Sequence, residues 1–567
     1  MRALLYLNSD KFNTNRQQLT ITFYKATLTM IFSHVRTQPG EVTSISLATR
    51  YISDPLAMLG KITEQSKNCL LLESAEINSK AHLQSMMLID AALKISCRGH
   101  QVRVDAKSNN GHAVLTFLAE QLAEFVTKTD ENAIEISFNR PDPLLDENSR
   151  LIHKNAFEVL RAIINTIKTN TDDPFSLFLG GVISYDMIAN FEDLPDAIDG
   201  ENSCPDYVFY LSETLLSIDH QDNTARLIGN VFSGPDAMAN CFEIGRRLED
   251  LHQLCENHID DNAANDAAKQ KITLAPNALQ NVDVDVSDED FCQTVEKMRE
   301  RIINGDIFQV VPSRSFSVPC TDSLLAYRKL KLSNPSPYMF YMADEDFVLF
   351  GASPESSLKY IKQTNQVEVY PIAGTRPRGF NDDGSINHDL DSRIELDLRS
   401  DTKENAEHIM LVDLARNDVA RISEPGSRHT TELLKVDRYS HVMHLVSKVV
   451  GQLQQDFDAL HAYQACMNMG TLTGAPKIRA TELIRETEQK RRGSYGGAVG
   501  YLNGNGDMDT CIVIRSAFVK NGVASVQAGA GVVYDSNPQA EADETRTKAQ
   551  AVLSAILHAN RLSEQGS

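Results

Sequence analysis

The sequence predicts an α+β protein with large, mostly antiparallel β-sheets and helices packed outside them. Apolar runs broken by glycine are typical of buried sheet strands, and they occur at residues 495–502 (YGGAVGYL), 510–519 (TCIVIRSAFV) and 524–534 (ASVQAGAGVVY). Segments with helical spacing alternate irregularly with such strands, and no repeat of solenoid length is present.

Length, charge and cysteine usage restrict the class of protein. A chain of 567 residues is too long for one ordinary core, so two or more folding units are expected. The net charge of −22 argues against a general nucleic-acid binder, which needs a basic face, but allows a small anionic ligand in a local basic pocket. No apolar run approaches the roughly 20 residues that span a membrane, and the N-terminus is a poor signal peptide. Nine scattered cysteines without a CxxC pair favour reduced thiols and a cytoplasmic location.

Composition divides the chain into four parts. Residues 1–41 have no clear period and are expected to be a poorly ordered extension, with Met30 as an alternative start. A first domain is predicted over 42–258 and a second over 287–567. Residues 259–286 lack large apolar side chains and are rich in Asn, Asp and Ala, as in a surface linker.

The first domain is expected to contain strands at 67–77 (KNCLLLESAEI), 178–188 and 206–218, and a closing helix at 236–259.

The second domain opens with a capped helix. Ser287 can cap it, and its apolar residues fall on one face: Phe291, Val295, Met298 and Ile302. Gly305 ends the helix, and a strand follows at residues 306–318.

Two pairs of acidic residues have helical spacing. Ser536 or Asn537 can cap a helix with Pro538 in its first turn, which places Glu541 and Glu544 on one face. The same spacing separates Glu404 from Glu407 in a second predicted helix. Two such faces could offer oxygen ligands to one Mg²⁺ ion, although glutamates at this spacing also commonly sit on solvated surfaces.

The segment Gly529-Ala530-Gly531 precedes the second acidic pair. Glycines in a strand can mark a bulge or tight sheet packing. Alternatively, their bare backbone N–H groups can approach a carboxylate, which would then bridge these amides and the metal ion.

Seven motifs occur in the order found in one enzyme family: PIAGTRPRG (371–379), EHIMLVDLARND (407–418), VDRYSHVMHLVS (436–447), MGTLTGAPKIRA (469–480), RRGSYGGAVGYL (491–502), DTCIVIRSA (509–517) and QAGAGVVYDSNPQAEADET (527–545). With them the chain resembles the chorismate-utilising enzymes, and most closely the large subunits (component I) of bacterial anthranilate synthases. The resemblance runs from about residue 68 to 557.

The resemblance implies a fold and a reaction. The fold is a sandwich-like core of two large sheets with helices outside and the active site in a cleft. The reaction joins chorismate and ammonia and then eliminates pyruvate, leaving anthranilate in the first committed step of tryptophan biosynthesis, with Mg²⁺ as cofactor.

The resemblance also assigns residues. Glu407 and Glu544 would bind Mg²⁺, and Glu404 and Glu541 would hold its waters. Chorismate would be held by Gly374, Thr375, Tyr495, Arg515, Gly529, Ala530, Gly531 and Lys548. Glu355 is the general-acid candidate, and burial would raise the pKa of its carboxyl group. His444 is a candidate for proton removal, although read alone it could be a satisfied core or surface histidine, and Thr471 would line the pocket.

Two positions distinguish relatives within the family. Gln309 stands where isochorismate and salicylate synthases carry a lysine that activates water, and Ala373 stands where aminodeoxychorismate synthases typically carry a lysine. A neutral amide cannot act as a base and alanine cannot attack the ring, so both favour anthranilate. An aminodeoxychorismate or isochorismate synthase, or a tryptophan-binding protein without catalysis, remain the alternatives.

Two further segments match the family's inhibitory L-tryptophan site, although read alone they are a strand end and a proline-rich turn. The matching residues are Glu73, Ser74, Asn334, Pro335, Pro337, Tyr338, Met339 and Phe340.

The resemblance also implies a partner. None of the cysteines lies in the glycine-flanked turn of a glutaminase nucleophile. Ammonia is therefore expected from a separate glutamine amidotransferase subunit (component II), in a heterotetramer of two large and two small subunits. No nucleic-acid or membrane partner is expected.

Overall fold

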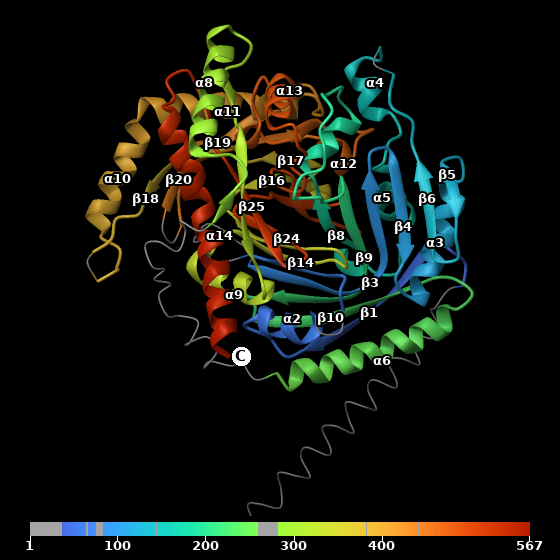
Figure 1. The fold of residues 1–567 in the computed structure, drawn as a ribbon. Helices are drawn as coiled ribbons and strands as arrows, with labels where there is room; N and C mark the ends of the chain where they lie inside the picture. The colour runs from blue at the N-terminus through green and yellow to red at the C-terminus, as the bar shows by residue number, and fades with distance from the viewer. Residues whose placement is uncertain are drawn as a thin grey trace, which may run out of the picture.

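The computed structural model describes residues 37–63, 66–74, 83–142, 144–258, 282–381, 383–439 and 442–566. Within them, 23 strands form one hydrogen-bonded network, β12 and β21 form a separate pair, and helices cover the outside (Figure 1). All named strand pairs in these residues are antiparallel except β1–β7. The α+β prediction with mostly antiparallel sheets is confirmed.

The elements before residue 258 are β1 Glu41–Thr49, α2 Pro55–Thr63, β2 Cys69–Glu73, β3 Gln84–Arg98, β4 Gln101–Ala106, α3 Asn109–Gln121, β5 Val126–Thr129, β6 Ala133–Ser137, α4 Glu147–Ile152, α5 Glu158–Thr166, β7 Lys168–Thr169, β8 Phe178–Ile183, β9 Tyr207–Asp219, β10 Thr224–Phe232 and α6 Ala237–Glu256.

The elements from residue 282 onward are β11 Asp283–Val284, α8 Asp288–Ile303, β12 Gln309–Val310, β13 Ser313–Pro319, α9 Ser323–Ser333, β14 Tyr338–Ala343, β15 Val348–Ser353, β16 Ser356–Ile361, β17 Gln366–Val369, β18 Ile372–Pro377, α10 His388–Ser400, α11 Thr402–Ala420, β19 His429–Arg438, β20 Val442–Gln452, α12 Ala459–Cys466, β21 Gly474–Ala475, α13 Lys477–Glu488, β22 Ala498–Asn503, β23 Met508–Ile512, β24 Ser516–Lys520, β25 Val523–Gly529 and α14 Pro538–Gly566.

Strand pairing joins the two predicted domains. β2 pairs with β14 and β8 pairs with β22, so each segment contributes strands to the same network. β11, at the end of the predicted linker, pairs with β13, while residues 1–36 and 259–281 lie outside the described residues. Because the two segments share sheet hydrogen bonds, strand pairing does not mark a boundary between them. The division at residues 258 and 287 therefore stays a prediction.

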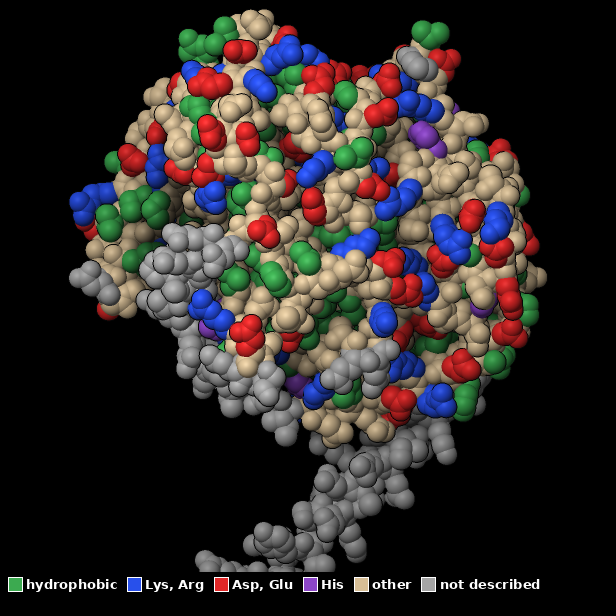
Figure 2. Space-filling model, in the orientation of Figure 1, with side chains coloured by type: hydrophobic (Ala, Val, Ile, Leu, Met, Phe, Trp, Pro, Cys, Tyr) green, Lys and Arg blue, Asp and Glu red, His purple; other side chains and the backbone are tan. Residues whose placement is uncertain are grey.

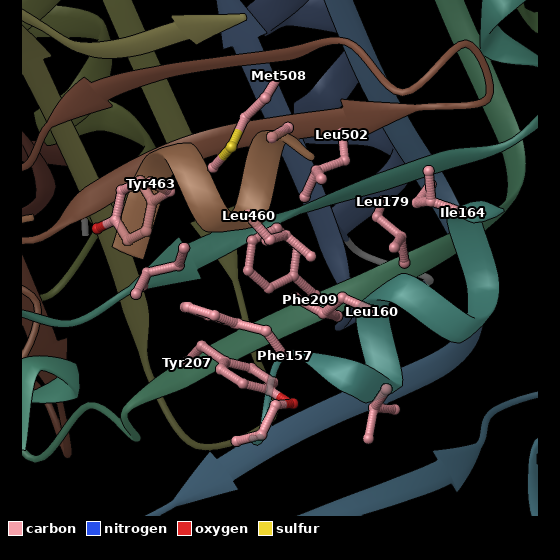
Figure 3. Close-up of a cluster of buried hydrophobic side chains, with 14 of the residues drawn as sticks. Phe157, Leu160, Ile164, Leu179, Tyr207, Phe209, Leu460, Tyr463, Leu502 and Met508 are labelled. Carbon is pink, nitrogen blue, oxygen red and sulfur yellow. The ribbon is translucent and has the colours of Figure 1, made fainter. Parts of the chain in front are cut away.

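The core also crosses this division. Figure 3 shows side chains from α5 and β9 packed against side chains from α12, β22 and β23; they include Phe157, Tyr207, Leu460, Leu502 and Met508. Each is almost fully buried, and burial of one large apolar side chain contributes about 1.5–3 kcal/mol. The two segments are therefore held together by a shared core as well as by strand pairing.

Two helix starts follow from local sequence. The Ser287 side chain accepts a hydrogen bond from the Asp290 N–H, which caps α8, while Phe291, Val295 and Met298 are buried as predicted. Of the two cap candidates for α14, Asn537 accepts from the Ala540 N–H at 3.0 Å. This cap fixes where the helix bearing Glu541 and Glu544 begins.

The distribution of surface charge and the character of the helices can be described directly. The face in Figure 2 carries acidic and basic side chains interspersed, without a continuous basic stripe. None of the helices that the structure describes combines the length and apolar character needed to cross a lipid bilayer.

Candidate active site

Glu355 is a buried carboxyl group at the start of β16. It is 5% exposed, and the Thr471 hydroxyl donates to its Oε1 at 3.1 Å. Burial raises the pKa of Glu355 to about 8, although the Thr471 hydrogen bond and the positive charges of Arg515 and Lys548 act in the opposite direction. At neutral pH most of this group is therefore protonated and can donate a proton.

Arg515 supplies a positive charge beside this acid. It links β23 to β24 with φ near +50°, a left-handed conformation that costs a non-glycine residue about 1–2 kcal/mol. Burial lowers the pKa of its guanidinium group, whereas Tyr495, Glu544 and Glu355 raise it. Within the described part of the chain no carboxylate forms an ion pair with Arg515. An unpaired, largely desolvated guanidinium group is suited to binding an anionic ligand.

His444 and Thr375 face each other on adjacent strands. They are register partners between β20 and β18, and Thr375 Oγ1 lies 2.8 Å from His444 Nδ1. Burial, together with the charge of Arg515, lowers the pKa of His444 to about 4. The ring is therefore neutral at pH 7 and can accept a proton, although it is a weak base until an anion enters beside it.

Glutamates of the two predicted pairs approach each other from α11 and α14. Burial raises the pKa of Glu407, and the charges of Glu404 on the same helix and Glu544 on α14 add to this shift. Burial also raises the pKa of Glu541 to about 7, with a contribution from Glu544. The carboxylates of α11 and α14 are therefore close enough to repel one another, and we call them the acidic cluster.

Lysine and arginine neutralise part of the cluster. Lys548 Nζ lies 2.6 Å from Glu544 Oε1; against the effect of burial, this contact lowers the pKa of Glu544. Arg376 Nη1 donates to Glu404 Oε1 at 2.7 Å. Among the described residues, no three His, Cys, Asp or Glu side chains converge as closely as in a preformed metal centre.

These donors nevertheless fit a hard divalent cation. Glu407 is mostly buried, and the neutral amide of Gln309 donates a hydrogen bond to its Oε1 at 2.9 Å. Carboxylate oxygens with uncompensated charge are the ligands that Mg²⁺ prefers when water and substrate complete its coordination.

The glycine segment differs in one respect from the prediction. The Ala530 N–H donates to the Pro312 carbonyl oxygen at 3.1 Å, so this amide is already used within the fold. Among the described residues the Gly531 N–H has no partner. Lys548 Nζ also donates to the Gly529 carbonyl oxygen, at 2.9 Å. The prediction of three bare amides is therefore wrong for Ala530, because strand pairing continues past Gly529.

Close packing explains why glycines occupy this segment and its neighbour. A Cβ atom at Gly529 would lie 3.1 Å from the buried Tyr495 hydroxyl oxygen, and one at Gly531 would lie 2.8 Å from Gln309 Nε2. Gly374, with φ near +85°, similarly brings β18 close to Glu404. The structure thus brings all the predicted active-site residues into one region.

Gly531→Ala tests this close approach. The added methyl group would displace the Gln309 amide from Glu407, so we expect about a tenfold or greater rise in KM for the substrate with little change in melting temperature. Gly60→Ala, where the nearest atom is a flexible Leu324 methyl group at 3.2 Å, is the matched control. Unchanged kinetics for Gly531→Ala would contradict the assignment.

Sequence reasoning missed two contacts. The Gln309 amide binds Glu407 directly, and its Oε1 is buried without a partner among the described residues. Arg376 binds Glu404, Asp401 and Asp397 together. Arg376 directly follows Gly374 and Thr375, the two neighbouring residues predicted to bind chorismate. This position in the sequence was the signal that Arg376 belongs to the site.

The two predicted regulatory segments also meet. Glu73 is the register partner of Met339, and its carboxylate accepts from the Tyr327 hydroxyl at 2.7 Å and from Lys331 Nζ at 2.5 Å. Asn334 caps the end of α9, which carries both partners, and Ser74, Pro335, Pro337 and Tyr338 complete the two segments.

Tyr338 and Phe340 require a correction. Successive residues of a strand point to opposite faces, and both side chains pack in a different core cluster from Met339. Neither side chain can therefore line a site on the face of β14 that carries Met339.

Three comparisons with known proteins agree with each other. A model of the chorismate binding enzyme family matches residues 116–554. The chain is 56% identical over 530 residues to "Anthranilate synthase component 1" of Vibrio cholerae serotype O1, covering 93% of this chain and 98% of the relative. It is 50% identical over 531 residues to the protein of the same name from Escherichia coli K12, covering 94% and 100%.

Solved structures show the same fold. Anthranilate synthase component I from Streptococcus pneumoniae TIGR4 has a TM-score of 0.59 and 29% identity, with 84% of this chain and 94% of that chain covered. The menaquinone-specific isochorismate synthase of Escherichia coli has a TM-score of 0.61 at 16% identity, covering 94% and 100%, and supports the fold alone.

Proposed function

Because the chain belongs to the chorismate binding enzyme family, and within it to the anthranilate synthase component 1 enzymes, we propose that it converts chorismate and ammonia to anthranilate, pyruvate and water. The observation that carries this proposal is the pairing of a buried, protonated carboxyl group at Glu355 with the unpaired guanidinium group of Arg515. One group can protonate a leaving hydroxyl while the other holds a carboxylate of the same small molecule.

Residues of the chain can bind the substrate and transfer the protons that this reaction requires. Arg515, the Tyr495 hydroxyl and the Gly531 N–H bind chorismate carboxylate, which orients the ring. Glu355 gives its proton to the C4 hydroxyl group, which leaves as water while ammonia adds to the ring. His444 then accepts a ring proton as the side chain departs as enolpyruvate, which takes up a proton to become pyruvate. Mg²⁺, held by Glu407 and Glu544 with waters on Glu404 and Glu541, would draw electron density from the ring through its carboxylate.

Two positions support ammonia as the nucleophile. Gln309, whose amide already donates to Glu407, cannot deprotonate water. Ala373 offers no amine that could attack the ring. Both features disfavour the isochorismate and aminodeoxychorismate alternatives.

The direct test is product analysis. The protein is mixed with chorismate, Mg²⁺ and ammonium, and anthranilate is detected by its fluorescence. Anthranilate is the expected product. Isochorismate or aminodeoxychorismate would identify the corresponding synthase, and tryptophan binding without any turnover would identify a binding protein.

The ammonia source is proposed to be a separate glutaminase subunit, in a cytoplasmic heterotetramer. Eight of the nine cysteines are buried, and burial raises, for example, the pKa of Cys69 and Cys320 to about 12, so these thiols are poor nucleophiles. We therefore expect glutamine to support turnover only after a glutaminase partner is added.

Inhibition by L-tryptophan is proposed at a pocket predicted beside Glu73. Ser74→Ala and Met339→Thr are expected to raise the inhibitory tryptophan concentration about tenfold or more while retaining activity, because each removes a contact from the pocket but none from the active site. Met342→Thr, a similar change on the opposite face of β14, is the control. If both variants keep wild-type tryptophan sensitivity, the pocket is not the inhibitory site.

A further inference from the structure

Arg492 lies at the junction of three segments that carry proposed active-site residues. It is 1% exposed, and its guanidinium group donates from Nη1 to the Leu472 carbonyl oxygen at 2.8 Å and from Nη2 to the Val311 carbonyl oxygen at 2.7 Å. The same group lies 5.6 Å from the centroid of the Tyr495 ring. One buried cation therefore links its own segment, which carries Tyr495, to the segments of Leu472 and Val311.

Glu488 holds this cation and adds a second contact to the segment of Val311. Arg492 Nε donates to Glu488 Oε2 at 2.9 Å, and Arg492 Nη2 donates to Oε1 at 2.5 Å. Oε1 also accepts from the Ser313 N–H at 2.9 Å and from the Ser313 hydroxyl at 2.8 Å. Ser313 is the register partner of Gly529, so the pair also fixes the strand beneath the glycine segment.

Each contact lies close in sequence to a residue that contacts a carboxylate of the proposed site. Leu472 follows Thr471, whose hydroxyl donates to Glu355, and Val311 lies two residues after Gln309. Movement of the guanidinium group would therefore be transmitted through a single peptide unit to the hydrogen bond that controls the proposed acid.

We propose that Arg492, held by Glu488, is a positioning residue that keeps Thr471, Tyr495 and Gly529 in the arrangement that binds and protonates chorismate. The inference rests on the proposed function. Arginine is required because its planar group can bind a carboxylate in two-point fashion, satisfy two carbonyl oxygens and lie near an aromatic ring. Lysine keeps the charge beside Glu488 but presents one nitrogen atom without this fixed geometry.

The test is Arg492→Lys in the full chain. We expect about a tenfold or greater fall in kcat and an upward shift of the basic limb of the pH profile of kcat/KM. The shift follows because a displaced Thr471 no longer lowers the pKa of Glu355. The other groups that face Glu355 are Arg515, Lys548 and Tyr439, and the substitution leaves their charges unchanged.

Three comparisons separate positioning from a general structural role. Arg161→Lys is the matched control, because Arg161 is also buried and forms ion pairs with Asp458 and Glu158, but these contacts join α5 and α12. In a Thr471→Val background, Arg492→Lys should cause no further pH shift, since the hydroxyl through which it acts is absent. Glu488→Gln should shift the profile in the same direction as Arg492→Lys, but less.

Every outcome decides between the proposals. If the wild-type chain forms no anthranilate, the proposed function is wrong. The contacts of Arg492 then support packing but no longer position residues for this reaction. If the wild type is active but Arg492→Lys fails to fold, or keeps the pH profile seen with Arg161→Lys, Arg492 is only a structural residue and the inference is wrong.

Discussion

Glu355→Gln is expected to lower kcat for anthranilate formation by about 10²–10⁴-fold while the chain stays folded, because the amide fills the same space but has no acidic proton to give. Glutamine can still accept the Thr471 hydrogen bond, so chorismate binding should change little. The measurement is steady-state kcat by anthranilate fluorescence, with circular dichroism to confirm folding.

The dependence of kcat/KM on pH tests whether Glu355 acts as the proton donor. Glu355 must be protonated to donate, so wild-type kcat/KM should fall as pH rises through about 8, where burial has placed the pKa of this group. This limb should be absent from the residual activity of Glu355→Gln.

A second buried carboxyl group supplies the control. Burial raises the pKa of Glu213, on β9, to about 7, and this residue lies near Ser108 and Asn110 rather than in the proposed site. Glu213→Gln should keep both the rate and the pH limb. Retention of more than about a tenth of wild-type kcat by Glu355→Gln would reject the acid assignment.

Local sequence was sufficient for the features that depend on neighbouring residues. The Ser287 cap, the buried face of α8 and the Asn537 cap arise within one or two helical turns, where spacing and capping chemistry decide the structure. The mutual approach of Glu407 and Glu544 was predicted as a consequence of two such helices and of the family resemblance, and the shared acidic cluster agrees with it.

Long-range contacts were not predictable in the same way. Whether the Ala530 amide is free depends on where strand pairing with Pro312 ends, and the face of Phe340 depends on sheet register. Arg492 and Arg376 are ordinary basic residues in sequence. Their roles follow only from carbonyl oxygens and carboxylates that distant segments bring to them.

Glu544→Gln is expected to abolish anthranilate formation without unfolding the chain. Lys548 keeps Glu544 ionised, so this carboxylate is ready to bind a cation, whereas a neutral amide is a much weaker ligand. The loss should also appear in metal binding itself: with benzoate present as a mimic of the ring carboxylate, the affinity for Mn²⁺ measured by electron paramagnetic resonance should fall at least about 100-fold.

Asp543→Asn is the control for this substitution. Asp543 lies on the same helix and its replacement removes the same charge, but its carboxylate accepts a hydrogen bond from Gln539 at 2.9 Å, whereas that of Glu544 contacts Lys548. It should retain both activity and metal affinity. Normal turnover of Glu544→Gln at matched Mg²⁺ would exclude Glu544 as a ligand. Lost turnover with unchanged Mn²⁺ affinity would assign Glu544 instead to holding Lys548 against the Gly529 carbonyl oxygen. The two readouts therefore separate a residue that binds the metal from one that only shapes the pocket wall.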